Sequence, residues 1–99
     1  MNKYEIMFIV RPDMEEAQIK KVAEDMKKVL TDKKAKVIDE KAMGQRELAY
    51  EIKKFNTGYY YLFVVEADAA AEQEFTRVAR INENLLRHLI VRVDEKEEV

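Results

Sequence analysis

Hydrophobic and polar positions alternate at the start of the chain. One face of the segment 3–10 carries apolar residues at a period of two, namely Tyr4, Ile6, Phe8 and Val10. This alternation is typical of a strand that buries one face. Pro12 interrupts the pattern, because a proline removes a backbone donor and is excluded from the middle of a sheet. The pattern therefore predicts a strand over 3–10 that ends before Pro12.

The following segment changes to a helical period. Apolar residues recur three or four positions apart, at Ile19, Val22, Met26, Val29 and Leu30. Asp13 is a favourable N-cap residue, and Glu16 follows three positions later, as in a capping box. These features predict a helix over about 14–30 with Asp13 at its N-cap and charged residues on its outer face.

The middle of the chain predicts a hairpin of two strands. Val37 has odd parity, whereas the apolar residues of the segment 48–52 (Leu48, Tyr50, Ile52) have even parity, and Gly44 lies between the two parts. A bulge near Gly44 would place both parts on one core face. The segment 55–58 is typical of a turn, with Gly58 free to adopt a positive φ. The next strand is predicted over 58–66.

A second helix and a last strand complete the pattern. Asp68 is the predicted N-cap of a helix that runs to about Ile81, and the segment 86–93 is the predicted last strand. The order β-α-β-β-α-β is that of the ferredoxin-like α+β fold. Right-handed crossovers would place both helices on one face of a four-stranded antiparallel sheet in the order 4-1-3-2. We expect residues 1–93 to form a single domain and the acidic tail 94–99 to be disordered.

The sheet face without helices is predicted to be apolar. Half-exposed antiparallel sheets are normally polar on the open side, but the strand over 58–66 is apolar on both sides. A contiguous apolar patch usually marks a partner site, although the preference of strands for such residues also explains the pattern. We predict contacts with a partner protein at Met7, Ile9, Tyr50, Tyr60 and Leu62.

The composition argues against several kinds of chemistry. Cys is absent and His88 is the single histidine, which argues against thiolate sites and a zinc site. Two glycines cannot form a phosphate-binding loop, and no buried pair of acids is evident. We therefore expect a binding protein without catalytic residues, metal or cofactor. The longest apolar run, 59–65, is far too short to span a bilayer, so no membrane partner is expected.

The charge is unevenly placed along the chain. The formal net charge is -2, but without the tail 94–99 the chain has 17 basic and 16 acidic residues. A local basic face is therefore compatible with the weak overall charge. Arginine suits phosphate through its planar fork, although compensation of a helix dipole also explains Arg77 and Arg80. We predict RNA contacts at Lys3, Arg46, Lys53, Lys54, Arg77, Arg80, Arg87 and Arg92.

Several segments resemble the bacterial small-subunit (30S) ribosomal protein six family. They are Tyr4-Glu5-Ile6, Arg11-Pro12, the run 44–52 (GQRELAYEI), Gly58-Tyr59-Tyr60 and the closing stretch 81–91. The resemblance covers nearly the whole chain in one register. It implies the ferredoxin-like fold, no catalysis, and a structural role in the cytoplasmic ribosome. It also implies binding to the central domain of 16S rRNA as a heterodimer with ribosomal protein eighteen.

The resemblance also bears on the basic positions. Lys3, Arg80, Arg87 and Arg92 match basic positions of the family. The basic N-terminal pair of the family is here Asn2-Lys3. Where the family has a glycine followed by three basic residues, this chain has the stretch 44–47 with Arg46 as its single cation, and Met43 replaces a common tryptophan. These departures predict weaker phosphate binding by that stretch.

Three alternative functions remain open from the residues. The segment 58–61 (GYYY) partly matches the third strand of an RNA-recognition motif, which would bind single-stranded RNA on its sheet. An enzyme of the acylphosphatase type would need a phosphate-cradling loop after the first strand, and Arg11-Pro12-Asp13 is short and lacks glycine. A homo-oligomeric regulatory domain would use the open face for pairing with itself.

Overall fold

Six elements of secondary structure follow one another in the computed structural model, which describes residues 2–93. They are β1 (Asn2–Val10), α1 (Glu16–Asp32), β2 (Lys36–Ile52), β3 (Phe55–Ala67), α2 (Ala69–Ile81) and β4 (Leu85–Val93). This order confirms the predicted β-α-β-β-α-β sequence of elements. The predicted disordered tail, 94–99, lies outside the described residues.

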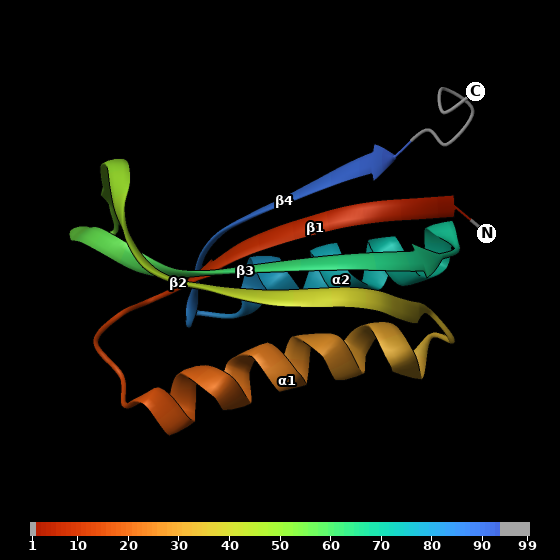
Figure 1. Cartoon of the computed structure of the whole chain (residues 1–99), viewed down its shortest axis with the longest axis horizontal. Coiled ribbons are helices and arrows are strands. Elements are labelled where there is room, and N and C mark those ends of the chain that lie inside the picture. The colour runs from red at the N-terminus through yellow and green to blue at the C-terminus, as the bar shows by residue number, and fades with distance from the viewer. Residues whose placement is uncertain (1, 94–99) are drawn as a thin grey trace.

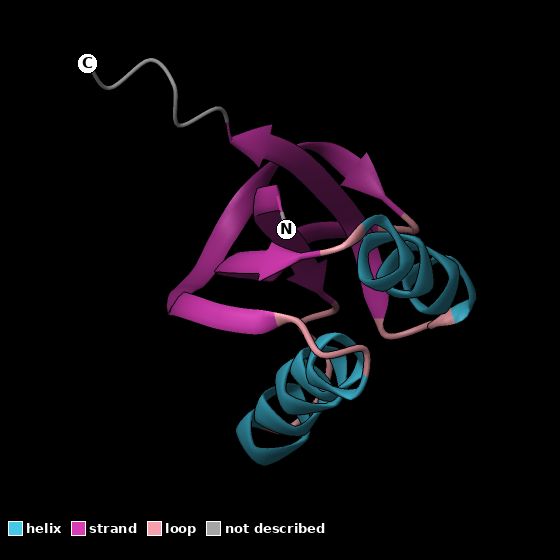
Figure 2. Ribbon diagram, turned by 90° about the vertical axis from the view of Figure 1, so that its right-hand side faces the viewer, coloured by secondary structure: helices cyan, strands magenta, loops and turns pink. Residues whose placement is uncertain are grey.

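The four strands form one antiparallel sheet, and both helices lie on the same side of it (Figure 2). The strand order is β2-β3-β1-β4, as predicted. β1 is central, because it pairs with β3 on one side and with β4 on the other. Each helix follows a strand and returns the chain to the opposite end of the sheet, and two such crossovers of the same hand place both helices on one face.

The core fills the space between the helices and the sheet. Its largest fully buried side chains come from β1, β3 and both helices, namely Ile6, Phe8, Val10, Ile19, Met26, Leu30, Phe63, Val65 and Phe75. Phe8 stacks on Tyr61 with ring centroids 5.4 Å apart, and it meets Phe63 edge-on at 5.2 Å. The Phe75 ring of α2 lies 6.2 Å away. The alternating residues of β1 and the helical stripes therefore meet as their periods predict.

The first helix begins later than its sequence signature indicates. Glu15 occupies the N-cap position, and its backbone N–H donates to the side-chain Oε1 of Gln18 at 3.2 Å. Asp13, the predicted N-cap, instead accepts hydrogen bonds from Nε and Nη2 of Arg11, at 2.7 and 2.9 Å. The prediction was wrong because a bidentate arginine, a strong partner for a carboxylate, binds Asp13. The predicted N-cap of α2, Asp68, is in place, although its side chain makes no capping hydrogen bond.

The turn of the β2–β3 hairpin lies at Lys53-Lys54 and not at the predicted segment 55–58. These two residues adopt φ values of 50° and 71°. Positive φ at both central residues is the condition for a two-residue hairpin turn of type I′. Gly58 does not adopt a positive φ and lies within β3. The prediction was wrong because lysine has no local preference for this turn, whereas the sequence 55–58 does.

The end of the β2–β3 hairpin extends beyond the sheet, and we call residues 46–57 the arm (Figure 1). The predicted bulge is present, since the register shifts between Ala42 and Gly44 and Gly44 has a φ of 87°. The apolar residues of the arm nevertheless do not join the core, contrary to the prediction. Tyr50 is 58% exposed, and Leu48 and Ile52 are half-buried. β1 ends opposite Tyr59, so the arm has no third strand beside it.

Gly58 is required by close packing, and this gives a first prediction. A Cβ at this position would overlap Cγ2 of Ile9 and would lie 3.4 Å from the carbonyl oxygen of Val10. We expect Gly58→Ala to lower the free energy of unfolding by about 1–3 kcal/mol, the usual cost of overpacking. Urea denaturation of both proteins measures the difference. A second substitution, Ile9→Ala, removes the overlapping methyl group and should recover part of this loss in the double variant. An unchanged urea midpoint for Gly58→Ala would contradict the prediction.

Candidate functional site

The sheet face opposite the helices carries apolar side chains in ordered rows. Because side chains alternate between the faces of a strand, the register determines which residues share this open face. Three rows cross it from β3 through β1 to β4, namely Val64-Glu5-Val91, Leu62-Met7-Leu89 and Tyr60-Ile9-Arg87. We call the apolar, accessible members of these rows the open-face patch, which consists of Met7, Tyr60, Leu62, Val64, Leu89 and Val91.

The exposure of the open-face patch increases toward β4. Leu89 is 53% exposed and Val91 is 46% exposed, whereas the members on β1 and β3 are half-buried. Ile9 lies on the same face but is only 5% exposed, next to the buried residues Gly58 and Leu86. Of the residues predicted to contact a partner, Met7, Tyr60 and Leu62 belong to the open-face patch. Ile9 lies beneath this surface and supports it.

The arm is held against the end of the sheet by contacts with β4 and with the residue after β1. The guanidinium of Arg87 lies over the ring of Tyr50, 5.6 Å from its centroid, and that of Arg11 lies 5.3 Å from the centroid of Phe55. The Nζ of Lys53 donates to the carbonyl oxygen of Leu85 at 3.5 Å. Contacts of this kind between a cation and an aromatic face each contribute about 0.5–1 kcal/mol at exposed sites. They place Tyr50, the remaining predicted partner contact, beside β4.

The same contacts bring Arg11, Lys53 and Arg87 to the base and tip of the arm, and Lys54 follows Lys53 in the turn. We call Arg11, Lys53, Lys54 and Arg87 the arm cluster. Three of them were predicted as RNA contacts, and Arg11 was not. In the sequence, only its place directly after β1 points to Arg11. In the structure, its backbone N–H donates to the carbonyl oxygen of Asn84 and so ties the end of β1 to the residue before β4. Cations interleaved with exposed aromatic rings are typical of nucleic-acid surfaces.

The other predicted RNA contacts lie elsewhere on the molecule. Lys3 and Arg92 lie at the opposite end of the sheet, where Arg92 donates to the side chain of Asn2 at 3.0 Å. Arg77 is bound to Glu74 on its own helix through two hydrogen bonds of 2.9 and 2.7 Å. Arg46 lies at the base of the arm and donates to the carbonyl oxygen of Met43. The structure therefore brings together only part of the predicted set.

Ion pairs and burial shift the pKa values of a few side chains. The hydrogen bond from Arg11 lowers the pKa of Asp13, and that from Arg77 lowers the pKa of Glu74. Burial, together with the charge of Arg80, lowers the pKa of His88, which packs edge-on against Phe75. The neutral form of His88 is therefore favoured, as expected of a packing residue.

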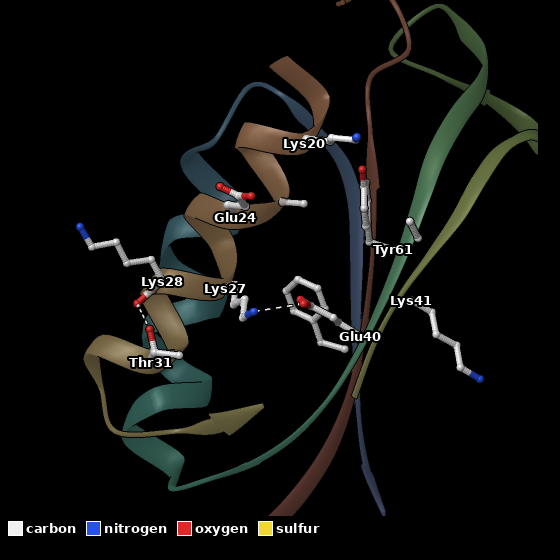
Figure 3. A pocket seen from close by; sticks show the side chains of 11 residues that line it. Lys20, Glu24, Lys27, Lys28, Thr31, Glu40, Lys41 and Tyr61 are labelled. Atoms are coloured by element: carbon white, nitrogen blue, oxygen red, sulfur yellow. Dashed lines mark hydrogen bonds and ion pairs between the residues drawn. The ribbon is translucent and has the colours of Figure 1, made fainter. Parts of the chain in front are cut away.

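A groove of about 550 Å³ separates α1 from β2 on the helix side of the sheet (Figure 3). Its floor includes Tyr61 and Phe63, and its rim alternates lysines with Glu24 and Glu40. Lys27 of α1 reaches across to Glu40 of β2, with a distance of 3.1 Å between Nζ and Oε1. Burial raises the pKa of Tyr61, whose hydroxyl stays protonated at neutral pH. The rim carries four lysines and two glutamates, and the pair of Lys27 with Glu40 neutralises part of this positive charge.

Within residues 2–93, the structure contains no cluster of His, Asp and Glu side chains that could hold a metal ion. No helix in the described part of the chain is both long and apolar enough to cross a membrane.

Comparison with known proteins identifies the family. A sequence model described as ribosomal protein S6 matches residues 3–92. The chain belongs to the ribosomal protein S6 family. It is 48% identical to the small ribosomal subunit protein bS6 of Halalkalibacterium halodurans over 95 residues, which cover 96% of this chain and 100% of that protein. The crystal structure of 30S ribosomal protein S6 from Thermotoga maritima matches with a TM-score of 0.89 and 33% identity, covering 93% of this chain and 87% of the other.

Membership of the S6 family confirms the resemblance found in the sequence and gives the function at a coarse level. The chain is a structural component of the small subunit of the bacterial cytoplasmic ribosome and not an enzyme. Ribosomal RNA is the partner that this role implies. The fold of the S6 crystal structure also confirms the ferredoxin-like arrangement predicted from the hydrophobic pattern. The open-face patch and the arm cluster are therefore candidate surfaces for binding within the ribosome.

Proposed function

We propose that this S6 protein binds the central domain of 16S rRNA as a heterodimer with ribosomal protein eighteen. The observation that carries the proposal is the open-face patch, an apolar surface left uncovered by both helices and bordered by the arm cluster. An exposed apolar surface favours a protein partner, and clustered cations favour phosphate. The two surfaces meet in the row that contains Tyr60 and Arg87.

The proposal divides the work between two surfaces. Met7, Leu62 and Leu89 form the middle row of the patch and bury against ribosomal protein eighteen. The arm cluster, with Arg46 beside it, then contacts the RNA backbone. Lys3, Arg77, Arg80 and Arg92 are secondary RNA contacts in this proposal, since they lie outside the cluster. Contacts with phosphates position a protein on folded RNA, and its shape supplies much of the specificity.

The near-neutral charge of the chain predicts that it binds rRNA weakly by itself. Affinity for nucleic acid depends mainly on the number of phosphates that cations neutralise, and the first 93 residues have only one more basic than acidic residue. We expect addition of ribosomal protein eighteen to raise the affinity for a central-domain fragment of 16S rRNA by about tenfold or more. Filter binding or fluorescence anisotropy at physiological salt, with and without the partner, measures the effect.

Tight binding of the fragment by the chain alone would contradict this division of labour, because the partner would then not be needed. The second candidate function, recognition of single-stranded RNA on the sheet, is favoured by the position of Tyr60 on the open face, in the same row as Arg87. It requires that short single-stranded RNA binds the chain alone and that Tyr60→Ala abolishes this binding.

A further inference from the structure

The two edges of the sheet differ in how they are protected. β2 forms one edge, and its pairing with β3 is interrupted between Val37 and Asp39 and again between Ala42 and Gly44. The first part of β2 also carries many charges, including Lys36, Glu40 and Lys41. Bulges and charged side chains are the usual means by which proteins prevent an edge strand from pairing with another chain. The β2 edge is therefore protected against strand addition.

The β4 edge lacks these features. Its pairing with β1 is continuous from Val93 to Arg87, and the register shifts only at the first residues of the strand. Within residues 2–93, no strand pairs with the outer side of β4. The sequence of the strand, LLRHLIVRV, contains no lysine and no acidic residue. A regular, apolar edge strand exposes a row of unpaired N–H and C=O groups that another strand can pair with.

The β4 edge is also continuous with the most exposed part of the open-face patch. Leu89 and Val91 are the patch residues closest to the edge, and both are more exposed than the patch members on β1 and β3. A strand added beside β4 would place alternate side chains on the open face, next to these two residues. It would thereby extend the patch and cover the exposed apolar surface at the same time.

We propose that β4 accepts an extended segment of the partner protein as a fifth strand of the sheet. The proposal rests on the proposed function, in which the partner is ribosomal protein eighteen. Because β4 carries no acid and Arg87 turns to Tyr50 of the arm, the complementary segment is neutral or acidic where it faces Arg92 and apolar where it faces Leu89 and Val91. A second copy of β4 is a poorer occupant, since it offers no acidic residue to either arginine.

The test of this proposal is backbone hydrogen exchange in the complex. Isotope-labelled chain is mixed with unlabelled ribosomal protein eighteen, and amide exchange is followed by NMR. We expect every second amide between Arg87 and Val93 to exchange about tenfold or more slowly in the complex, because only alternate N–H groups point away from β1. The amides on the outer side of β2 should keep their rates. Docking on the open face without a new strand would not produce this period of two.

A pair of matched substitutions supplies the control. Val91 and Ile38 are both 46% exposed, but they lie on opposite edge strands. We expect Val91→Lys to raise the dissociation constant of the heterodimer about tenfold or more, and Ile38→Lys to change it less than about twofold. An unchanged melting temperature, measured for each variant, would show that its fold is intact.

The possible outcomes distinguish failure of the fifth-strand proposal from failure of the proposed heterodimer. If ribosomal protein eighteen binds the chain but the alternate amides of β4 stay unprotected, or β2 becomes protected instead, the fifth strand is refuted and the proposed function stands. If the two proteins do not bind at all, both are refuted. Protection of β4 that appears in the concentrated chain alone would assign the edge to self-association and would also overturn the proposal.

Discussion

Replacing Phe8 by alanine is expected to lower the free energy of unfolding by about 3–5 kcal/mol, the range for truncating a buried phenylalanine. Phe8 is fully buried, and its ring contacts those of Tyr61, Phe63 and Phe75. The substitution therefore removes the side chain through which the central strand, its neighbour β3 and helix α2 pack together. A domain of this size has a total stability of about 5–15 kcal/mol, so the loss would amount to about a fifth of it or more.

Urea denaturation followed by circular dichroism measures this loss. Leu89→Ala is a suitable control, because Leu89 lies on a strand paired with β1 but is 53% exposed. We expect this control to change the free energy of unfolding by less than about 1 kcal/mol, as for most surface substitutions. A similar loss for both variants would show that the helix side of the sheet is not the dominant core.

The order of elements could be predicted because each depends on a local period. Alternation over β1 and the apolar stripe of α1 are properties of short segments, and the structure buries the residues that they select except Tyr4 and Val29, which are half-buried. The strand order then follows from the handedness of the two crossovers, which holds for nearly all such connections. These parts of the fold required no knowledge of which residues touch across the chain.

The hairpin turn could not be predicted because its determinants are not local. Lys53 and Lys54 adopt a conformation that favours asparagine or glycine, and the contact of Lys53 with the carbonyl oxygen of Leu85 supports the turn from another strand. Gly58 is needed where the backbone of β3 passes Ile9 of β1. A glycine near the end of an apolar run suggests a turn, and only the pairing of β1 with β3 shows its actual role.

The arm shows the limit of reading alternation as burial. Tyr50 alternates with Leu48 and Ile52 as a core strand would, but β1 and β4 are nine residues long and β2 is seventeen. The extra length of β2 and β3 therefore passes beyond the core. Similarly, the sequence identified most cations of the arm cluster but could not group them, because Lys53 and Arg87 become neighbours only when the arm packs on β4.

Removing three of the four charges of the arm cluster is expected to weaken rRNA binding by the heterodimer on the order of 10²–10³-fold. The variant is Lys53→Asn, Lys54→Asn and Arg87→Gln. Asparagine tolerates the positive φ of the turn, so the hairpin turn itself should keep its conformation, while the contacts of Lys53 with Leu85 and of Arg87 with Tyr50 are lost together with the three charges. Hydrogen bonds contribute about 1–1.5 kcal/mol each after competition with water, so three of them account for the expected factor, and the loss of three phosphate contacts would reduce the salt dependence of log K by about two to three.

The matched control removes three lysines from the helix side, with Lys20, Lys21 and Lys28 each replaced by glutamine. All three are exposed on α1, away from the open face, and the change in net charge is the same. If the arm cluster holds the RNA backbone, the control should bind within about threefold of the unmodified heterodimer, with a nearly unchanged salt slope. Equal losses in the two variants would mean that RNA responds to the total charge of the protein, and the arm would then have no special part in binding.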